Sequence, residues 1–144
     1  MGETTYTTRG SAANLLSTEM NSLADGSLVI STSEFDNSSN LDLLCDVEFN
    51  LASIDLSAQT SPAVYIWFIN NLSGQENGGA GVTPARAPDV IIPLRAVSAA
   101  QVVSIAGLPC PNISFDTVIK NNTGVAFASS GTTLKIETYG LTTA

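Results

Sequence analysis

We predict an all-β protein, a jelly-roll-like β-sandwich of about eight strands with an extended or short-helical N-terminal arm. Residues 42–53 alternate between apolar and polar side chains, and residues 63–69 are continuously apolar. Turn-forming segments rich in Gly, Asn and Ser then recur roughly every ten residues, which is typical of antiparallel sandwiches. The 144 residues suit one ordinary domain. We place the arm at residues 1–26 and the sandwich at residues 27–144.

The first part of the chain has little apolar surface to bury. Residues 1–10 are rich in threonine and predict an arm that is flexible or docked on a partner. Residues 11–24 place three leucines and Met20 at helical spacing, which predicts one short helix that ends at Asp25-Gly26. An extended or hairpin-like arm is the alternative.

The strand pattern is clearest in residues 42–53. A period of two indicates a strand with one buried face and one solvated face. The predicted buried face holds Leu43, Cys45, Val47, Phe49 and Leu51. The opposite face holds Asp42, Asp46, Glu48 and Asn50, with Leu44 as the exception.

The remaining strands follow from apolar runs and turn signals. Residues 63–69 (AVYIWFI) are apolar on both faces, which predicts a central strand. Further strands are expected at residues 27–32, 89–94, 101–106, 113–120, 125–128 and 133–139. Pro93 indicates an edge strand or a bulge. Residues 70–88, rich in glycine and proline, predict a long loop of the kind that is often functional.

Charge and composition exclude several functions. The net charge is −8, and the few basic residues are scattered, so we expect no direct binding of nucleic acid and no attraction to anionic membranes. Residues 1–14 are polar and no apolar run approaches the ~20 residues of a membrane span, so we expect no signal peptide and synthesis in a cytoplasm. We leave open whether Cys45 and Cys110 are reduced thiols or form a disulfide.

The residues that carry common chemistry are missing or poorly arranged. The chain has no histidine, which removes Ser-His-Asp and Cys-His catalysis. Asp46 and Glu48 share a strand face about 7 Å apart, but an acid–base pair needs a desolvated cleft, and a solvated face is the ordinary interpretation. Residues 36–42 alternate oxygen side chains, but Leu41 occupies the position at which a calcium loop needs glycine. We therefore expect neither an enzyme nor a cofactor.

Two aromatic residues suggest one binding alternative. Tyr65 and Trp67 share a strand face, as do the aromatic platforms of sugar-binding modules. Core aromatic residues show the same spacing more often. A carbohydrate-binding β-sandwich is therefore kept as an alternative, which requires these rings or the loop at residues 70–88 to be exposed.

Several segments resemble small virion structural proteins of tailed bacteriophages. The resemblance lies in residues 4–12 (TTYTTRGSA), 15–26 (LLSTEMNSLADG), 82–90 (VTPARAPDV), 92–97 (IPLRAV), 120–124 (KNNTG) and 128–134 (ASSGTTL). Within that group the chain is most similar to capsid cement or decoration proteins, which bind outside the shell of major capsid protein. None of these segments is a catalytic motif.

The resemblance implies a jelly-roll-like fold, a place on the capsid surface after assembly in the host cytoplasm, and homo-oligomers, with a trimer favoured. The implied partner is the major capsid protein. Arg9, Arg86 and Arg95 are the predicted charged anchors, because arginine is favoured at interfaces and basic residues are scarce here. Solvated arginines or internal salt bridges are the alternative. A β domain associated with a tail, neck or fibre is the alternative location.

Overall fold

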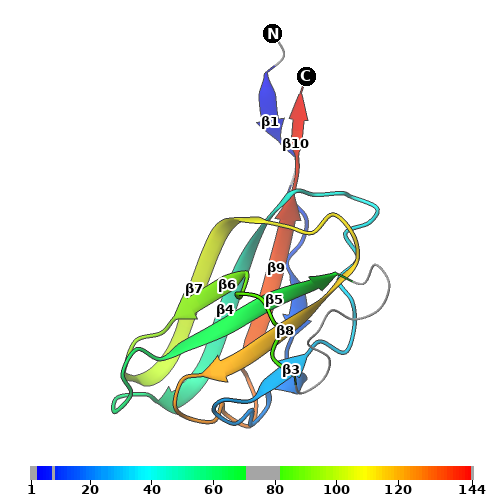
Figure 1. Ribbon diagram of the computed structural model, residues 1–144. Helices are drawn as coiled ribbons and strands as arrows, with labels where there is room; N and C mark the ends of the chain where they lie inside the picture. Colours follow the sequence, from blue (N-terminus) through cyan, green and yellow to red (C-terminus); the bar gives the residue numbers. More distant parts are fainter. Residues whose placement is uncertain (1–2, 8, 71–81, 144) are drawn as a thin grey trace.

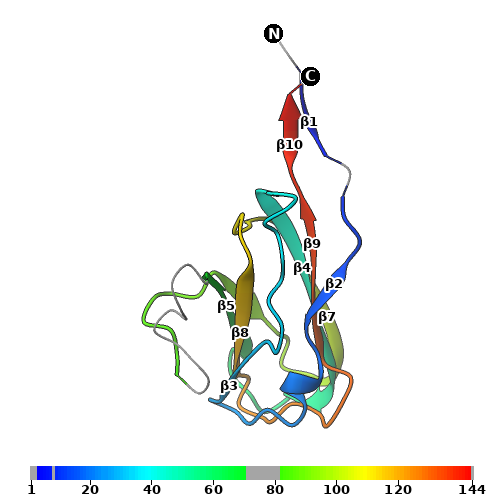
Figure 2. The same cartoon turned by 90° about the vertical axis from the view of Figure 1, so that its right-hand side faces the viewer.

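The computed structural model describes residues 3–7, 9–70 and 82–143, and it confirms an all-β fold (Figure 1). Two four-stranded antiparallel sheets have the orders β2-β9-β4-β7 and β3-β8-β5-β6. We call them the β4 sheet and the β5 sheet. They face each other as two layers, and a two-stranded ribbon of β1 and β10 extends from one end (Figure 2). The strands are β1 Thr4–Tyr6, β2 Ala13–Leu16, β3 Leu28–Ile30, β4 Leu44–Asp55, β5 Ala63–Asn70, β6 Val90–Pro93, β7 Ser98–Pro109, β8 Phe115–Asn122, β9 Thr133–Tyr139 and β10 Leu141–Thr143.

The connectivity is that of a jelly roll. From β2 to β5 the chain alternates between the two sheets, β5 and β6 pair within the β5 sheet, and the alternation resumes from β7 to β9. This winding of eight strands confirms the predicted jelly-roll-like sandwich. β5 is an interior strand, as its apolar sequence predicts, and β6, with Pro93, is an edge strand.

The alternation in β4 produces the core between the sheets. Cys45, Val47, Phe49 and Leu51 are all buried, while the residues between them remain partly exposed. Val64, Ile66 and Phe68 from the β5 sheet belong to the same cluster. The prediction for Leu43 is wrong: it precedes the strand and its side chain is exposed, because the pleat that orients Cys45 begins only at Leu44.

The predicted helix at residues 11–24 is also wrong, and the extended alternative is closer. Ala13–Leu16 forms β2, which pairs with β9, and only Thr18–Met20 is helical, as a single 3₁₀ turn. The backbone of β9 offers hydrogen bonds that an isolated short helix cannot match, and Leu15, Leu16 and Met20 are buried in the core. The sandwich therefore begins at Ala13 rather than at Ser27.

Residues 125–128 do not form the predicted strand. Their backbone bonds instead with the turn after the 3₁₀ segment, where the Phe127 N–H donates to the Leu23 carbonyl and the Ser22 N–H donates to the Ala128 carbonyl. Buried Asn121 supports this crossing, since its amide donates to the Leu23 and Val125 carbonyls. Phe127 thus enters the core without strand pairing.

The two cysteines are brought together by the pairing of β4 with β7. Cys45 lies opposite Leu108, and the Cys110 N–H donates to the Leu43 carbonyl. Both are buried free thiols, and Asn37 donates a hydrogen bond to Cys110 Sγ at 3.5 Å. The neighbouring Cys110 thiol and burial raise the pKa of Cys45.

In the part of the chain that the structure describes, no helix has the length and apolar character needed to cross a membrane.

Candidate binding surface

The β1–β10 ribbon is the feature that least resembles an ordinary sandwich. Its register pairs Thr4 with Thr143, Thr5 with Thr142 and Tyr6 with Leu141. The Thr5 and Thr142 hydroxyls lie 3.1 Å apart on the exposed surface. A two-stranded ribbon buries little apolar surface and is marginally stable in water without other contacts. The ribbon therefore depends on its base, or on a partner, for order.

The base ties both ends of the chain to the sandwich. The Thr7 N–H donates to the Gly140 carbonyl at 2.9 Å, and the Gly140 N–H donates to Thr7 Oγ1 at 2.6 Å. A side chain at Gly140 would begin 3.2 Å from Asp42 Oδ1, which is tighter than ordinary contact. The loop that carries Asp42 therefore packs closely against the base.

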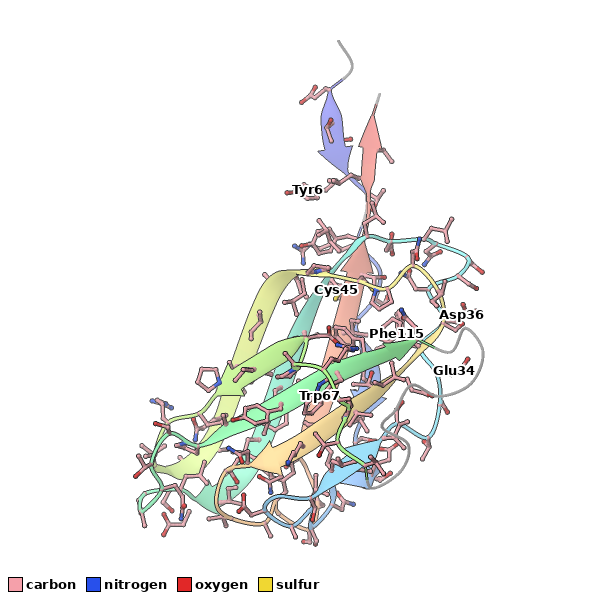
Figure 3. All side chains as sticks on the ribbon, in the orientation of Figure 1. Tyr6, Glu34, Asp36, Cys45, Trp67 and Phe115 are labelled. Atoms are coloured by element: carbon pink, nitrogen blue, oxygen red, sulfur yellow. The ribbon has the colours of Figure 1, made fainter. Side chains whose placement is uncertain are left out.

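Apolar side chains gather at this end of the molecule. Tyr6, labelled on the ribbon in Figure 3, is 70% exposed. Its cross-strand neighbour Leu141 is 47% exposed. Leu41 and Leu43 are also exposed, in the loop whose Ser39, Asn40 and Asp42 line a hollow together with Thr7 and Gly10. We call Tyr6, Leu41, Leu43 and Leu141 the apical apolar residues. They make this end a candidate docking surface.

Arg9 joins the arm to the β4 sheet. Its guanidinium forms ion pairs with Asp46 and Glu137 and lies 4.4 Å from the centre of the Tyr139 ring. Tyr6 meets the same ring edge-on, with ring centres 5.7 Å apart. Arg9 therefore holds the arm to its own chain, which is the internal salt-bridge alternative, and its role as a partner anchor stays a prediction.

Asp46 is held in its ionised form. Partial burial raises the pKa of Asp46. Hydrogen bonds from Arg9, the Gly107 N–H and the Tyr139 hydroxyl lower the pKa by more than burial raises it, so the net pKa lies below the usual value. A general acid needs the opposite shift. Asp46 and Glu48 share a face, as predicted, and line an open hollow of about 270 Å³ with Lys135 and Glu137. The arrangement suits a solvated ion-pair network.

The other two predicted anchors lie elsewhere. Arg86 forms an ion pair with Asp89 at 2.8 Å and donates to the Phe68 carbonyl at 2.7 Å, so it fastens residues 86–89 to β5. Arg95 is exposed between β6 and β7, and its backbone is clamped by Gln101 through two hydrogen bonds of 2.8 and 2.9 Å. The structure thus places the three arginines on separate elements instead of gathering them in one site.

The core interpretation of the two aromatic residues is confirmed for Trp67, while Tyr65 is partly exposed. Tyr65 and Trp67 share the outer face of the β5 sheet, but Trp67 is only 2% exposed and its indole N–H donates to the Arg86 carbonyl at 3.0 Å. Trp67, Ile69 and Val118 form a second apolar cluster on that face. The Trp67 ring is therefore not presented to a ligand. Most of the predicted loop at residues 70–88 lies outside the described residues.

The alternating oxygen residues at 36–42 form a turn. Asp36 Oδ1 accepts hydrogen bonds from the Ser38 N–H and hydroxyl and from the Ser114 hydroxyl, which lower its pKa. Asn37 is buried and bonds to the Asp42 backbone and the Pro111 carbonyl. Within residues 3–7, 9–70 and 82–143, no group of acidic, cysteine or histidine residues is arranged to hold a metal ion.

Sequence reasoning missed the apical apolar residues. Tyr6 lies in a threonine-rich segment, and Leu141 follows a glycine near the end of the chain. Leu41 precedes the predicted strand at residues 42–53, whereas Leu43 lies within it. For Tyr6, Leu41 and Leu141 the available signal is a large apolar side chain outside the predicted strands, whereas Leu43 is predicted on a buried strand face. Their convergence depends on the pairing of the two chain ends.

Comparison with known proteins adds little. No family model matches the chain, and no curated protein sequence matches it. Among solved structures, the fold is similar to part of an arabinose-bound GH51 α-L-arabinofuranosidase, with 12% identity and a TM-score of 0.37. The alignment covers 85% of this chain and 18% of the length of that enzyme chain. A likeness this weak supports no statement about activity.

Proposed function

We propose that this protein is a structural component of a tailed-bacteriophage virion, a capsid decoration protein that binds the major capsid protein through the end carrying the β1–β10 ribbon. The observation that carries the proposal is the ribbon itself, which projects beyond the sandwich with Tyr6 and Leu141 exposed (Figures 1 and 2). The sequence resemblance to virion proteins supplies the identity of the partner.

The physical argument rests on the ribbon's incomplete packing. Its three register pairs have no core beneath them in the described structure, and Tyr139 is the one aromatic ring that Tyr6 contacts among the described residues. Docking on a protein surface would bury Tyr6 and Leu141 and order the ribbon. Leu41 and Leu43, the apical apolar residues next to the base of the ribbon, would extend the same contact.

The distribution of chemistry also favours a binding role. Asp46 is engaged by three donors and its pKa is lowered, so this carboxylate is suited to holding Arg9 rather than to proton transfer. A net charge of −8 suits a partner with a basic or mixed surface. A regular shell would repeat a weak ribbon contact many times and so retain the protein through avidity.

The location can be tested by cryo-electron microscopy of purified virions of the virus that encodes the chain. Density for the sandwich in many symmetric copies on the capsid lattice, with the ribbon against major capsid protein, is the expected result. Density confined to the tail, neck or fibres would replace the capsid role by the alternative location. Absence from the particle would overturn the virion proposal.

The ribbon's role can be tested separately by occupancy. Leu141→Ser should leave the protein folded but lower the number of copies retained on purified capsids at least several-fold. Ile91→Ser is the matched control, because Ile91 is 52% exposed but lies on β6, at the edge of the β5 sheet. Equal retention of the two variants would refute docking through the ribbon.

A further inference from the structure

The four edge strands of the two sheets differ greatly in length. Three edge strands are short: β2 has 4 residues, β3 has 3, and β6 has 4 and ends in Pro93. The fourth edge strand, β7, has 12 residues. Short edges and prolines are the usual protection against unwanted strand pairing. β7 is long, and its proline, Pro109, lies at its far end, so the stretch from Gln101 to Ile105 has neither kind of protection.

β7 also has no charged side chain that would oppose pairing with another strand. Residues 96–115 contain no Asp, Glu, Lys or Arg, although the chain has 13 acidic and 5 basic residues. The residues of β7 whose side chains face solvent are small or apolar: Ser98, Ala100, Val102, Ser104 and Ala106. Val102 is 64% exposed at the middle of the strand. Natural edge strands of this length usually carry lysine or an inward charge.

The middle of β7 is regular. From Gln101 to Ile105 it runs in unbroken register with β4, between an irregularity near Ala99 and a bulge at Gly107, whose φ of +72° suits glycine. Every second residue of an antiparallel edge directs its N–H and C=O away from the neighbouring strand. In the described structure β7 pairs with no strand other than β4, so the groups that point away from β4 have no backbone partner there, and Figure 1 shows no strand beyond β7 on that side.

We infer that the free edge of β7 pairs antiparallel with β7 of a second copy of this chain, around a two-fold axis at Val102. This register places Val102 opposite its own symmetry mate and Ala100 opposite Ser104. The pairing is isologous and closes on itself, so it produces a dimer with a continuous eight-stranded sheet from two β4 sheets. It does not depend on the proposed virion role, and it differs from the trimer that the sequence resemblance implies.

The acidic character of the chain is compatible with this pairing. The nearest acids are Asp46, Glu48 and Asp55 on β4, one strand away from the edge. In the dimer, the two β4 strands would lie three strand spacings apart, about 14 Å. That separation exceeds the Debye length of about 8 Å at physiological ionic strength. Residual repulsion predicts that added salt strengthens the dimer.

The test is the concentration dependence of mass for the full chain by sedimentation velocity. The wild type should show a reversible monomer–dimer equilibrium that shifts toward dimer between 50 mM and 500 mM NaCl. Val102→Lys should weaken the dimer at least tenfold, because it brings two ammonium groups together at the axis. Ile91→Lys, the same change on the exposed edge of the β5 sheet, should leave the equilibrium unchanged.

A cross-link defines the register. Residues facing each other across an antiparallel pair have Cα atoms about 4.5–5.5 Å apart, within the 4.4–6.8 Å range of disulfides. Val102→Cys should therefore form a covalent dimer with oxidised glutathione, by thiol–disulfide exchange that releases two glutathione thiols. Ser98→Cys, about 27 Å from its symmetry mate by strand rise, should not. A wild type that is monomeric at all concentrations, or an oligomer unaffected by Val102→Lys, would overturn the inference.

Discussion

The sandwich and the ribbon are both antiparallel β-structure, yet they are held together in opposite ways. In the sandwich, β4 and β5 bury Phe49, Ile66 and Phe68 between two layers, and β5 also buries Trp67 on its outer face. In the ribbon, three register pairs stand apart from any layer and leave Tyr6 and Leu141 exposed. The same backbone pairing is self-sufficient in one region and incomplete in the other. The difference shows where the fold leaves apolar surface uncovered.

The largest expected effect lies in the core between the sheets. Phe49→Ala should lower the free energy of unfolding by about 3–5 kcal/mol, because a fully buried ring leaves a cavity. Leu43→Ala is the sharpest control, since the sequence pattern places it on the same face but the structure exposes it. Its effect should stay within about 0.5 kcal/mol by urea denaturation. Similar losses for both variants would contradict the observed start of β4.

A smaller effect is expected on the outer face of the β5 sheet. Trp67→Phe removes the indole donor to the Arg86 carbonyl and should cost about 1–3 kcal/mol. The emission of Trp67, the only tryptophan, should be blue-shifted and weakly quenched by iodide in the wild type. Red-shifted, strongly quenched emission would mean an exposed ring and would revive the sugar-binding alternative.

The junction between sandwich and ribbon should show an acid-dependent contribution. The pKa of Asp46 is lowered in the folded state, so its carboxylate stabilises the fold above its unfolded pKa of about 3.9, and this stability is lost as pH falls through the folded pKa. Asp46→Asn should cost about 1 kcal/mol at pH 7, and the gap to the wild type should shrink below about pH 4.

Glu48→Gln is the control for this pH dependence, because its carboxylate accepts from Asn50 and not from Arg9. Free energies of unfolding are compared from pH 7 to pH 2. A gap for Asp46→Asn that does not change with pH would show that the Asp46 charge contributes no stability.

The smallest effect on stability is expected in the ribbon. Leu141→Ser should change the free energy of unfolding by no more than about 0.5 kcal/mol, because the side chain is already exposed. In the free protein, amides of β1 and β10 should exchange with deuterium far faster than those of β4, which is paired on both sides. Equal protection in both regions would show that the ribbon is stable without a partner.

The candidate surface was predicted only in outline from the sequence. The threonine-rich residues 1–10 indicate an arm, and Arg9 is predicted as a charged anchor toward a partner, with an internal salt bridge as the alternative. Its partners Asp46 and Glu137 lie 37 and 128 residues away in sequence, and no local pattern indicates that they meet. The pairing of β1 with β10 joins the two ends of the chain, which sequence periodicity cannot detect in segments of three residues.

The sequence by itself determined the elements whose own side chains dictate a pattern. Alternation of apolar and polar residues predicts β4, because successive side chains of a pleated strand point to opposite faces. Apolar residues on both faces predict that β5 is an interior strand, and the missing N–H of Pro93 indicates an edge strand or a bulge at β6. Only the tertiary structure decided that residues 13–16 are a strand, that Trp67 is covered, and that β7 is an open edge. These outcomes depend on which distant backbone groups find partners, and long-range pairing leaves no trace in local spacing.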